Sequence, residues 1–289
     1  MTPPASGHVT IVEVAPRDGL QNESRLVDTE DKIRLVDLLS DCGYERIEVT
    51  SFVSPRWVPQ MADAPAVMAG IARRPGTRYA ALTPNMRGFE AARAVHVDEV
   101  AIFASASESF SEKNINCSIA ESIERFRPVA EAARNHRIPL RGYVSCVVEC
   151  PYEGAIAPAA AARVARLLAD LGCYEISLGD TIGRGTPEAV DAMLSAVLDE
   201  IVATKLAGHF HDTSGRALEN IAVALERGLR AFDASAGGLG GCPYAPGAAG
   251  NVDTLAVNAF LKARGFSSGL DAEKLARAAR FARSLRSAA

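Results

Sequence analysis

The sequence lacks the long hydrophobic run that a membrane-spanning helix requires. None of its apolar stretches approaches the roughly 20 residues that are needed to cross a bilayer. The N-terminal segment MTPPASGHVT also lacks the basic and then apolar order of a secretion signal, and it is not the Arg-rich amphipathic segment of a transit peptide. We therefore expect a cytoplasmic protein with no membrane partner.

A strong excess of charge of either sign is also missing. The 289 residues include 31 Lys and Arg against 35 Asp and Glu, which gives a formal net charge of −4. Binding to nucleic acid usually depends on concentrated positive charge, so we predict no nucleic-acid partner. With 48% hydrophobic residues the chain can bury a large core, and its length fits a single α/β domain over residues 1–289.

The six cysteines form neither a CxxC pair nor a dense disulfide framework. In a reducing compartment we expect them to be mostly free thiols. Cys42, Cys146 and Cys173 lie in or beside apolar segments, and we interpret them as small buried hydrophobic residues. Cys242 differs from these because it lies within a run of glycines.

Short β-rich runs alternate with longer amphipathic segments along the whole chain. The predicted strands are Val9–Val14, Arg46–Thr50, Arg78–Leu82, Glu99–Phe103, Leu140–Ser145, Tyr174–Leu178, Leu206–His211 and Ala231–Ala234. The predicted helices include Thr29–Cys42, Ile119–His136, Pro158–Leu171, Pro187–Ala203, Gly215–Arg227, Val252–Ala263 and Ala272–Leu285. Eight such units predict a (β/α)8 TIM barrel over about residues 8–265, with an extra C-terminal helix at about 271–286. An open doubly wound sheet would call for fewer strands and a GxGxxG turn after the first strand, which is absent.

The stretch GHFHDTSG places His209 and His211 two residues apart at the end of an apolar run. Alternate side chains of a β-strand share a face, so both imidazoles would point into one site while Phe210 packs on the opposite side. Neutral imidazole binds several divalent metals. The pair alone leaves open the alternative that these are hydrogen-bonded structural histidines.

Asp18 and Asn251 would complete a metal site with oxygen ligands. The active site of a barrel lies at the C-terminal ends of its strands, and Asp18 follows the first strand, close to the seventh in a closed barrel. Asn251, at the far end of the glycine loop, offers an amide oxygen. Such a ligand set leaves open positions on an octahedral ion, which favours Mg²⁺ or Mn²⁺ over a closed zinc site. Taken alone, Asp18 can also be a turn-capping residue.

Four further residues are candidates for the chemistry. Arg17 would neutralise charge that develops on a metal-bound oxygen, or else form a structural salt bridge at the barrel rim. We interpret Glu48 as a group that orients Arg17 and the ligands, whereas the sequence leaves the role of Asp180 open between supporting group and acid or base. Cys242 would deliver a proton to a carbanion, or it is an incidental loop residue.

A series of motifs covers nearly the whole chain in order. They are VEVAPRDGLQNE, EVTSFVSPRWVPQM, LTPN, EKNINCSI, RGYVSC, CPYEG, GCYEISLGDTIGRGTP, HFHDTSGRA and GLGGCPYAPGAAGN. Together they resemble the 3-hydroxy-3-methylglutaryl-CoA lyase family, within the wider group of metal-dependent TIM-barrel lyases and acyl-transferring synthases. A matching set of this length is far more specific than an HxH pair or a glycine-rich loop alone.

The resemblance implies a retro-Claisen cleavage of a tertiary 3-hydroxyacyl-CoA to acetyl-CoA and acetoacetate. It implies that Asp18, His209, His211 and Asn251 bind the divalent cation, and that Cys242 is the catalytic thiol of a mobile loop. It assigns enolate stabilisation to Arg17, with Glu48 and Asp180 as supporting acidic residues. The positions that it places near the acyl-CoA are Gln21, Ser51, Asn114, Arg141, Tyr143 and Ser177. We also expect a homodimer formed through the outer helices.

Three departures from the family pattern bear on the acyl group. Ser24 stands where the family has Lys, Ser214 replaces an aromatic residue, and an acidic pair expected after Asn251 is displaced, with Asp253 and Leu255 in this segment. They leave open a lyase for a longer or branched 3-hydroxyglutaryl-CoA. A synthase that condenses acetyl-CoA with a 2-oxo acid is disfavoured, since the chain has no room for the usual extra C-terminal domain. A non-catalytic binding barrel would not explain why all the site residues occur together.

Overall fold

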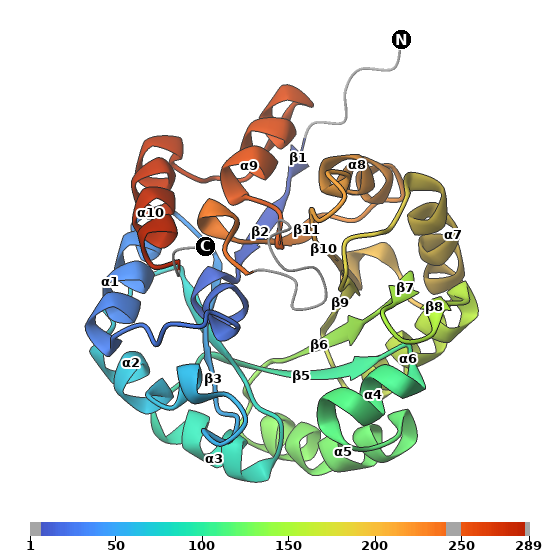
Figure 1. Ribbon diagram of the computed structural model, residues 1–289, viewed down its shortest axis with the longest axis horizontal. Helices are drawn as coiled ribbons and strands as arrows, with labels where there is room; N and C mark the ends of the chain where they lie inside the picture. Colours follow the sequence, from blue (N-terminus) through green and yellow to red (C-terminus); the bar gives the residue numbers. More distant parts are fainter. Residues whose placement is uncertain (1–6, 241–249, 287–289) are drawn as a thin grey trace.

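A closed barrel of parallel strands forms the centre of the computed structural model, which describes residues 7–240 and 250–286 (Figure 1). In barrel order its strands are β10 (Leu206–Phe210), β11 (Ala231–Ala234), β2 (Thr10–Glu13), β3 (Arg46–Ser51), β4 (Arg78–Leu82), β5 (Glu99–Ser105), β6 (Leu140–Ser145) and β9 (Glu175–Asp180). The ring closes where β9 pairs with β10. The predicted (β/α)8 barrel is confirmed, and each of its strands lies within two residues of the predicted bounds.

Helices surround the barrel on the outside (Figure 1). They are α1 (Thr29–Ser40), α2 (Ala64–Gly70), α3 (Met86–Ala94), α4 (Glu108–Ile115), α5 (Ile119–Asn135), α6 (Pro158–Leu171), α7 (Pro187–Leu198), α8 (Ala217–Glu226), α9 (Thr254–Ala263) and the extra C-terminal α10 (Ala272–Ser284). The smaller elements are the parallel pair β1 (Gly7–His8) and β12 (Phe266–Ser267), and the antiparallel hairpin β7 (Glu149–Cys150) and β8 (Gly154–Ala155). In the described part of the chain, no helix is long and apolar enough to span a bilayer.

Three of the predicted helix boundaries were wrong for identifiable local reasons. Helix α7 ends at Leu198 rather than at Ala203. Asp199 and Glu200 follow Leu198, and in a longer helix their negative charges would be repelled by the negative C-terminal end of the helix dipole. Helix α8 begins at Ala217 because Gly215 adopts a φ of +71°, which is outside the helical region. Helix α9 begins at Thr254, since the side chain of Asp253 accepts a hydrogen bond from the amide of Leu255.

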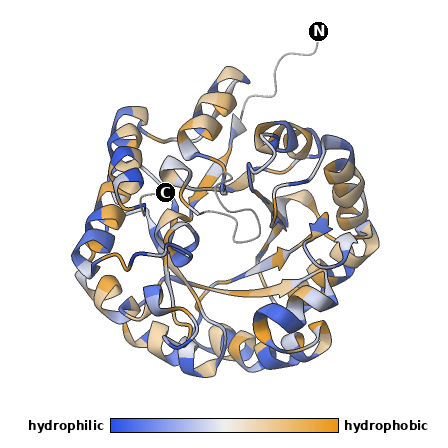
Figure 2. Ribbon diagram, viewed as in Figure 1, coloured by the Kyte–Doolittle hydropathy of each residue, from blue (hydrophilic) through white to orange (hydrophobic). Residues whose placement is uncertain are grey.

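The main hydrophobic core lies between the barrel and its helices. It runs from Val9 near the first strand to Leu285 at the end of α10, and it includes Phe210, which is 1% exposed. Figure 2 shows the corresponding pattern, with most helices carrying both apolar and polar residues. Phe210 therefore packs outward, as predicted, and leaves the neighbouring His209 to face the interior.

Charged side chains fill much of the barrel interior. Arg46 on β3 pairs with Glu175 on β9 at 2.7 Å, and Arg141 on β6 pairs with Asp233 on β11 at 2.7 Å. Neither pair of strands is adjacent, so both contacts cross the interior. Arg141 also reaches Glu175 at 2.8 Å, which joins the two pairs. Buried charges are tolerated because they are paired, and this network holds Asp233 in place.

Glu13, at the end of β2, accepts hydrogen bonds from four residues that lie outside the barrel strands. Its carboxylate accepts hydrogen bonds from the backbone amides of Ala15 and Ala236, both at 2.9 Å. The hydroxyl groups of Tyr44 and Thr254 donate to its other oxygen. Because Glu13 is fully buried with no cation among these partners, burial raises its pKa to about 7 despite the four donors.

Replacing Glu13 with Gln is expected to flatten the dependence of unfolding free energy on pH. The folded-state pKa of about 7 lies above the ordinary 4.5, so protonation of Glu13 stabilises the fold at low pH. That stabilisation, about 3 kcal/mol at most, is lost as pH rises through 7. Gln keeps an acceptor for the two amides and a donor for the hydroxyls, so it mimics the protonated acid. Urea unfolding of both proteins between pH 5 and 8 measures the difference, and parallel curves would contradict this account.

Candidate metal-binding active site

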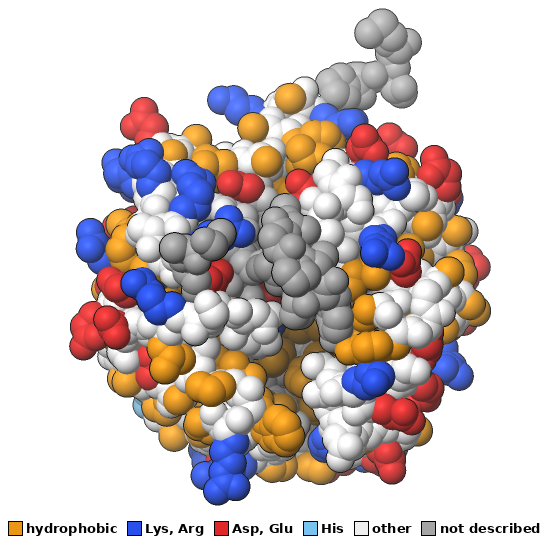
Figure 3. Space-filling model, viewed as in Figure 1, with side chains coloured by type: hydrophobic (Ala, Val, Ile, Leu, Met, Phe, Trp, Pro, Cys, Tyr) orange, Lys and Arg blue, Asp and Glu red, His pale blue; other side chains and the backbone are white. Residues whose placement is uncertain are grey.

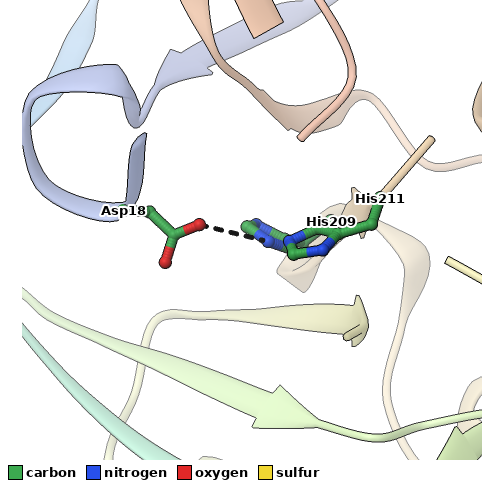
Figure 4. Close-up of side chains that lie close together, drawn as sticks. All are labelled: Asp18, His209 and His211. Atoms are coloured by element: carbon green, nitrogen blue, oxygen red, sulfur yellow. Dashed lines mark ion pairs between the residues drawn. The ribbon is translucent and has the colours of Figure 1, made fainter. Parts of the chain in front are cut away.

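Asp18, His209 and His211 form a compact cluster at one end of the barrel. One candidate ligand atom from each lies within 4.8 Å of the others, and Nε2 of His209 is 4.0 Å from Oδ2 of Asp18. Figure 4 shows the carboxylate of Asp18 pointing toward the two imidazoles. The two imidazoles, predicted from their spacing to share a face, have ring centroids 5.3 Å apart. The structure thus brings together three of the four predicted metal ligands.

Each ligand is held by the segment that carries it. Asp18 lies in a single π-helical turn, η1 (Ala15–Gly19), that directly follows β2. His209 ends the inward face of β10, and His211 lies just beyond that strand, where it bridges to Asn251. Gly19 is required in η1 because a Cβ there would lie 2.8 Å from the Cβ of Leu239.

Asn251 lies beside the cluster, but it presents its amide nitrogen rather than its amide oxygen to Asp18. Its Nδ2 donates to Oδ2 of Asp18 at 2.8 Å and to the carbonyl of Leu239 at 3.2 Å. Gly240 allows this approach, because its φ is +103° and a Cβ there would lie 2.6 Å from Nδ2 of Asn251. The amide therefore lies at the site, although its nitrogen faces Asp18. Coordination through the predicted amide oxygen requires the other orientation of this group.

The donor set fits a divalent cation. Although burial opposes it, Arg17 and the two histidines lower the pKa of Asp18 to about 2, so its carboxylate is ionised at neutral pH. Burial, together with His209, lowers the pKa of His211 to about 4, so this imidazole is neutral. Nδ1 of His211 is buried and has no hydrogen-bond partner among the described residues. An ionised carboxylate beside neutral imidazole nitrogen is a typical ligand set for a divalent metal.

Asp233 is a functional candidate that was not predicted from the sequence. Its Oδ2 lies 3.1 Å from Nδ1 of His209, which leaves Nε2 facing Asp18. Asp233 pairs directly with His209 between β10 and β11, so an acidic residue inside the apolar run AFDA was the available signal. Arg141 and Ser177, both placed near the acyl-CoA by the resemblance, direct polar atoms to Asp233 at 2.7 Å. A carboxylate behind a ligating histidine fixes its tautomer and orientation.

Replacing Asp233 with Asn is expected to weaken Mn²⁺ binding about 10- to 100-fold. The neutral amide removes the negative charge that orients His209 and that balances the positive charge of Arg141. Isothermal titration of wild type and variant with Mn²⁺ measures the change. The matched control is Asp180→Asn, a buried acid at the end of β9 that lies away from the cluster. Equal affinities for Mn²⁺ in all three proteins would contradict this role for Asp233.

Arg17 connects the cluster to a second buried carboxylate. Its Nε donates to Oε2 of Glu48 at 2.6 Å, and its Nη1 donates to Oδ1 of Asp18 at 2.6 Å. The guanidinium carbon also lies 5.4 Å from the ring centre of Tyr143. Oε1 of Glu48 is buried without a hydrogen-bond partner in the described part of the chain, and burial raises the pKa of Glu48. Arg17 is thus held between the carboxylates of Glu48 and Asp18.

Comparison with known proteins identifies the family. The model described as HMGL-like matches residues 8–282. The chain belongs to the HMGL-like family. The resemblance to 3-hydroxy-3-methylglutaryl-CoA lyases that the motifs indicated is thereby confirmed.

Relatives of the HMGL-like family match nearly the whole chain. The chain is 57% identical to 3-hydroxy-3-isohexenylglutaryl-CoA/hydroxymethylglutaryl-CoA lyase of Pseudomonas aeruginosa, over 92% of this chain and 89% of that protein. It is also 57% identical to the mitochondrial hydroxymethylglutaryl-CoA lyase of Gallus gallus, over 92% and 90%. The solved HMG-CoA lyase of Brucella melitensis shares 64% identity with a TM-score of 0.96, covering 97% of this chain and 99% of that one. An HMG-CoA lyase from Acinetobacter baumannii, solved with coenzyme A and 3-methylmalate, shares 36% identity with a TM-score of 0.90, covering 96% and 91%.

The other positions suggested by the HMGL-like resemblance have different surroundings. Ser51 is fully buried on β3 and its hydroxyl has no hydrogen-bond partner among the described residues, whereas Asn114 is exposed on α4. Gln21 is half-buried just after η1. Tyr143 lies beside Arg17, as described above. Cys242 lies outside the described residues.

Asp180 is not brought to the metal cluster. It pairs with Phe210 in the register of β9 and β10, so it faces outward, opposite to His209. Its carboxylate accepts hydrogen bonds from the backbone amides of Gly185 at 2.8 Å and Arg184 at 3.3 Å. Asp180 thus holds the loop that follows β9.

The three departures from the family pattern also lie at the periphery. Ser24 and Ser214 are exposed, and the amide of Ser214 donates to the carbonyl of Gly183. Asp253 caps α9, on which Leu255 is half-buried.

Proposed function

We propose that this protein is a metal-dependent carbon–carbon lyase that cleaves (S)-3-hydroxy-3-methylglutaryl-CoA to acetyl-CoA and acetoacetate. The observation that carries the proposal is the Asp18, His209 and His211 cluster beside Arg17, in a chain that matches lyases of this name over nearly all of its length. A chain that covers about nine-tenths of such a relative contains the same catalytic unit.

Asp18, His209 and His211 would hold the divalent cation, for which we propose Mg²⁺ or Mn²⁺, and Asn251 lies where it would add a fourth ligand. When bound, the cation supplies a Lewis acid for the substrate hydroxyl and carboxylate. Asp233 keeps His209 in the orientation that presents Nε2.

The chemistry breaks one carbon–carbon bond. The substrate hydroxyl loses its proton, the resulting ketone departs as acetoacetate, and the thioester enolate takes a proton on carbon to give acetyl-CoA. Arg17, fixed between Glu48 and Asp18, is placed to stabilise negative charge on the reacting oxygens. We propose Cys242 as the proton donor to the enolate, on the family resemblance. We also propose an acyl-CoA substrate, a homodimer and a cytoplasmic location.

Purified protein with Mg²⁺ is expected to release acetyl-CoA and acetoacetate in equal amounts from 3-hydroxy-3-methylglutaryl-CoA. Excess chelator is expected to abolish this release, because the three ligands hold the cation that the reaction needs. Restoring Mg²⁺ or Mn²⁺ in excess should recover the rate, and the two metals can be compared directly. Full activity in excess chelator would remove the metal mechanism, and consumption of acetyl-CoA with a 2-oxo acid would instead indicate a synthase.

A further inference from the structure

An apolar patch interrupts the charged interior of the barrel. Leu82 on β4, Ala101 on β5 and Tyr143 on β6 form a hydrophobic cluster separate from the main core, with Phe103 packed against them. Ala101 is in register with Arg141, whose guanidinium crosses the barrel to Asp233, so this face of β5 points inward. Phe103 also packs against the main core, where its ring centre lies 5.5 Å from that of Phe126 on α5, so we call Leu82, Ala101 and Tyr143 the interior wall.

The interior wall borders the candidate metal site through Tyr143. The ring of Tyr143 lies under the guanidinium of Arg17, and it meets the ring of His209 edge-on with 6.3 Å between the ring centres. The hydroxyl of Tyr143 accepts a hydrogen bond from Nη1 of Arg141 at 2.8 Å, which turns its oxygen toward the charged network. The guanidinium carbon of Arg141 also lies 4.9 Å from the ring centre, so the hydroxyl of Tyr143 is engaged by the charged network, whereas its ring borders Arg17 and His209.

Two side chains of the interior wall remain partly accessible to solvent. Leu82 and Tyr143 are each 8% exposed, although both face the inside of a closed barrel. Ser51, which is in register with Leu82, adds a fully buried hydroxyl without a hydrogen-bond partner among the described residues. In Figure 3, the hollow near the centre of the visible face is lined in part by hydrophobic side chains. Apolar surface beside a few unpaired polar groups is typical of a small-molecule site.

We propose that the interior wall receives the substituent on C3 of the 3-hydroxyglutaryl-CoA substrate and determines how large that substituent can be. This inference rests on the proposed lyase function. In such a substrate the hydroxyl, the carboxylate and the thioester oxygen are polar and belong with the cation and Arg17. The C3 substituent is the apolar group attached to the same carbon as the hydroxyl, so it must contact a surface next to the metal cluster. The interior wall is the apolar surface that the described residues place there.

Leu82 is the side chain whose size tests this proposal. We expect Leu82→Ala to raise, by about tenfold, the ratio of kcat/KM for 3-hydroxy-3-isohexenylglutaryl-CoA to that for 3-hydroxy-3-methylglutaryl-CoA, since a change of a few carbon atoms in an apolar pocket has effects of this size. Leu82→Phe is expected to lower the same ratio. The matched control is Val100→Ala, which removes apolar volume from the opposite, outward face of neighbouring β5.

A binding measurement separates recognition from turnover. Glutaryl-CoA analogues that carry a methyl or an isohexenyl group on C3 but no hydroxyl cannot be cleaved, so their inhibition constants report binding alone. Leu82→Ala should tighten binding of the isohexenyl analogue relative to the methyl analogue, and it should leave Mn²⁺ affinity within a few-fold of wild type.

The outcomes distinguish this inference from the proposed function. If wild type cleaves 3-hydroxy-3-methylglutaryl-CoA but the Leu82 variants change both substrates and both analogues by the same factor, the interior wall does not contact the C3 substituent. An equal shift of the ratio in Val100→Ala would also overturn the proposal, because it would show a general effect of core volume. If wild type cleaves neither substrate, the proposed function fails and this inference fails with it.

Discussion

Arg17→Lys is expected to lower kcat about 100- to 1,000-fold, the loss typical of removing one preorganised donor from an active site. Lysine keeps the positive charge, but it cannot donate to Glu48 and Asp18 from the two ends of one planar group. It also loses the stacking on Tyr143. Because the charge is retained, Mn²⁺ affinity should change only a few-fold. Steady-state kinetics and metal titration of the same preparation measure both effects.

Arg46→Lys is the matched control for this substitution. Arg46 is likewise buried and donates from two nitrogens to one carboxylate, that of Glu175, but it does so within the charged network rather than at the metal cluster. This variant is expected to lose stability while kcat stays within about tenfold of wild type, since only contacts to the reacting atoms stabilise the transition state selectively. Equal losses of kcat in the two variants would mean that Arg17 acts only through the fold.

His211→Ala is expected to weaken Mn²⁺ binding more than about 100-fold and to abolish cleavage at low metal concentrations. This loss exceeds the range typical of residues that only hydrogen-bond to a metal ligand. His211 follows the strand directly and bridges to Asn251, so its removal affects a ligand without opening the barrel. Titration with Mn²⁺ and the dependence of the rate on metal concentration are the measurements. His136→Ala, which removes an exposed imidazole at the end of α5, should change neither.

An unchanged metal affinity in His211→Ala would contradict the proposed ligand set. Recovery of the rate at high metal concentration would instead support it, because such recovery shows that the variant lacks affinity rather than a catalytic group. The same experiment on Asp233→Asn is expected to give a smaller shift, since Asp233 acts on the cation only through His209.

The periodic pattern of the sequence was sufficient to predict the barrel. Each barrel strand is a short β-rich run, and long helices such as α5 and α6 have clear apolar faces, so local composition agrees with the fold. The short helices α2, α3 and α4 were not predicted, because seven to nine residues contain too few turns for a distinct helical period.

The residues of the candidate metal site could also be proposed from the sequence, for a different reason. The spacing of His209 and His211 at the end of one strand indicated a shared site. Asp18 was a candidate because it follows the first strand, and the active site of such a barrel lies at the C-terminal ends of its strands. The family motifs then joined them with Asn251 and Cys242. Asp233 was missed because one acidic residue in a short apolar strand carries no signal of its partner, which lies 24 positions away in the chain.

The sequence by itself therefore determined the barrel, the family and the residues that gather at the metal cluster, because these depend on local periodicity and on motifs of fixed spacing. Only the tertiary structure decided which residues these side chains contact across the barrel. The register of β9 with β10 turned Asp180 outward, and ion pairs across the barrel assigned Arg141 to Asp233. The closure of the barrel placed Leu82, Ala101 and Tyr143 on one wall beside the metal cluster. Such contacts join residues far apart in the chain, and no local pattern specifies them.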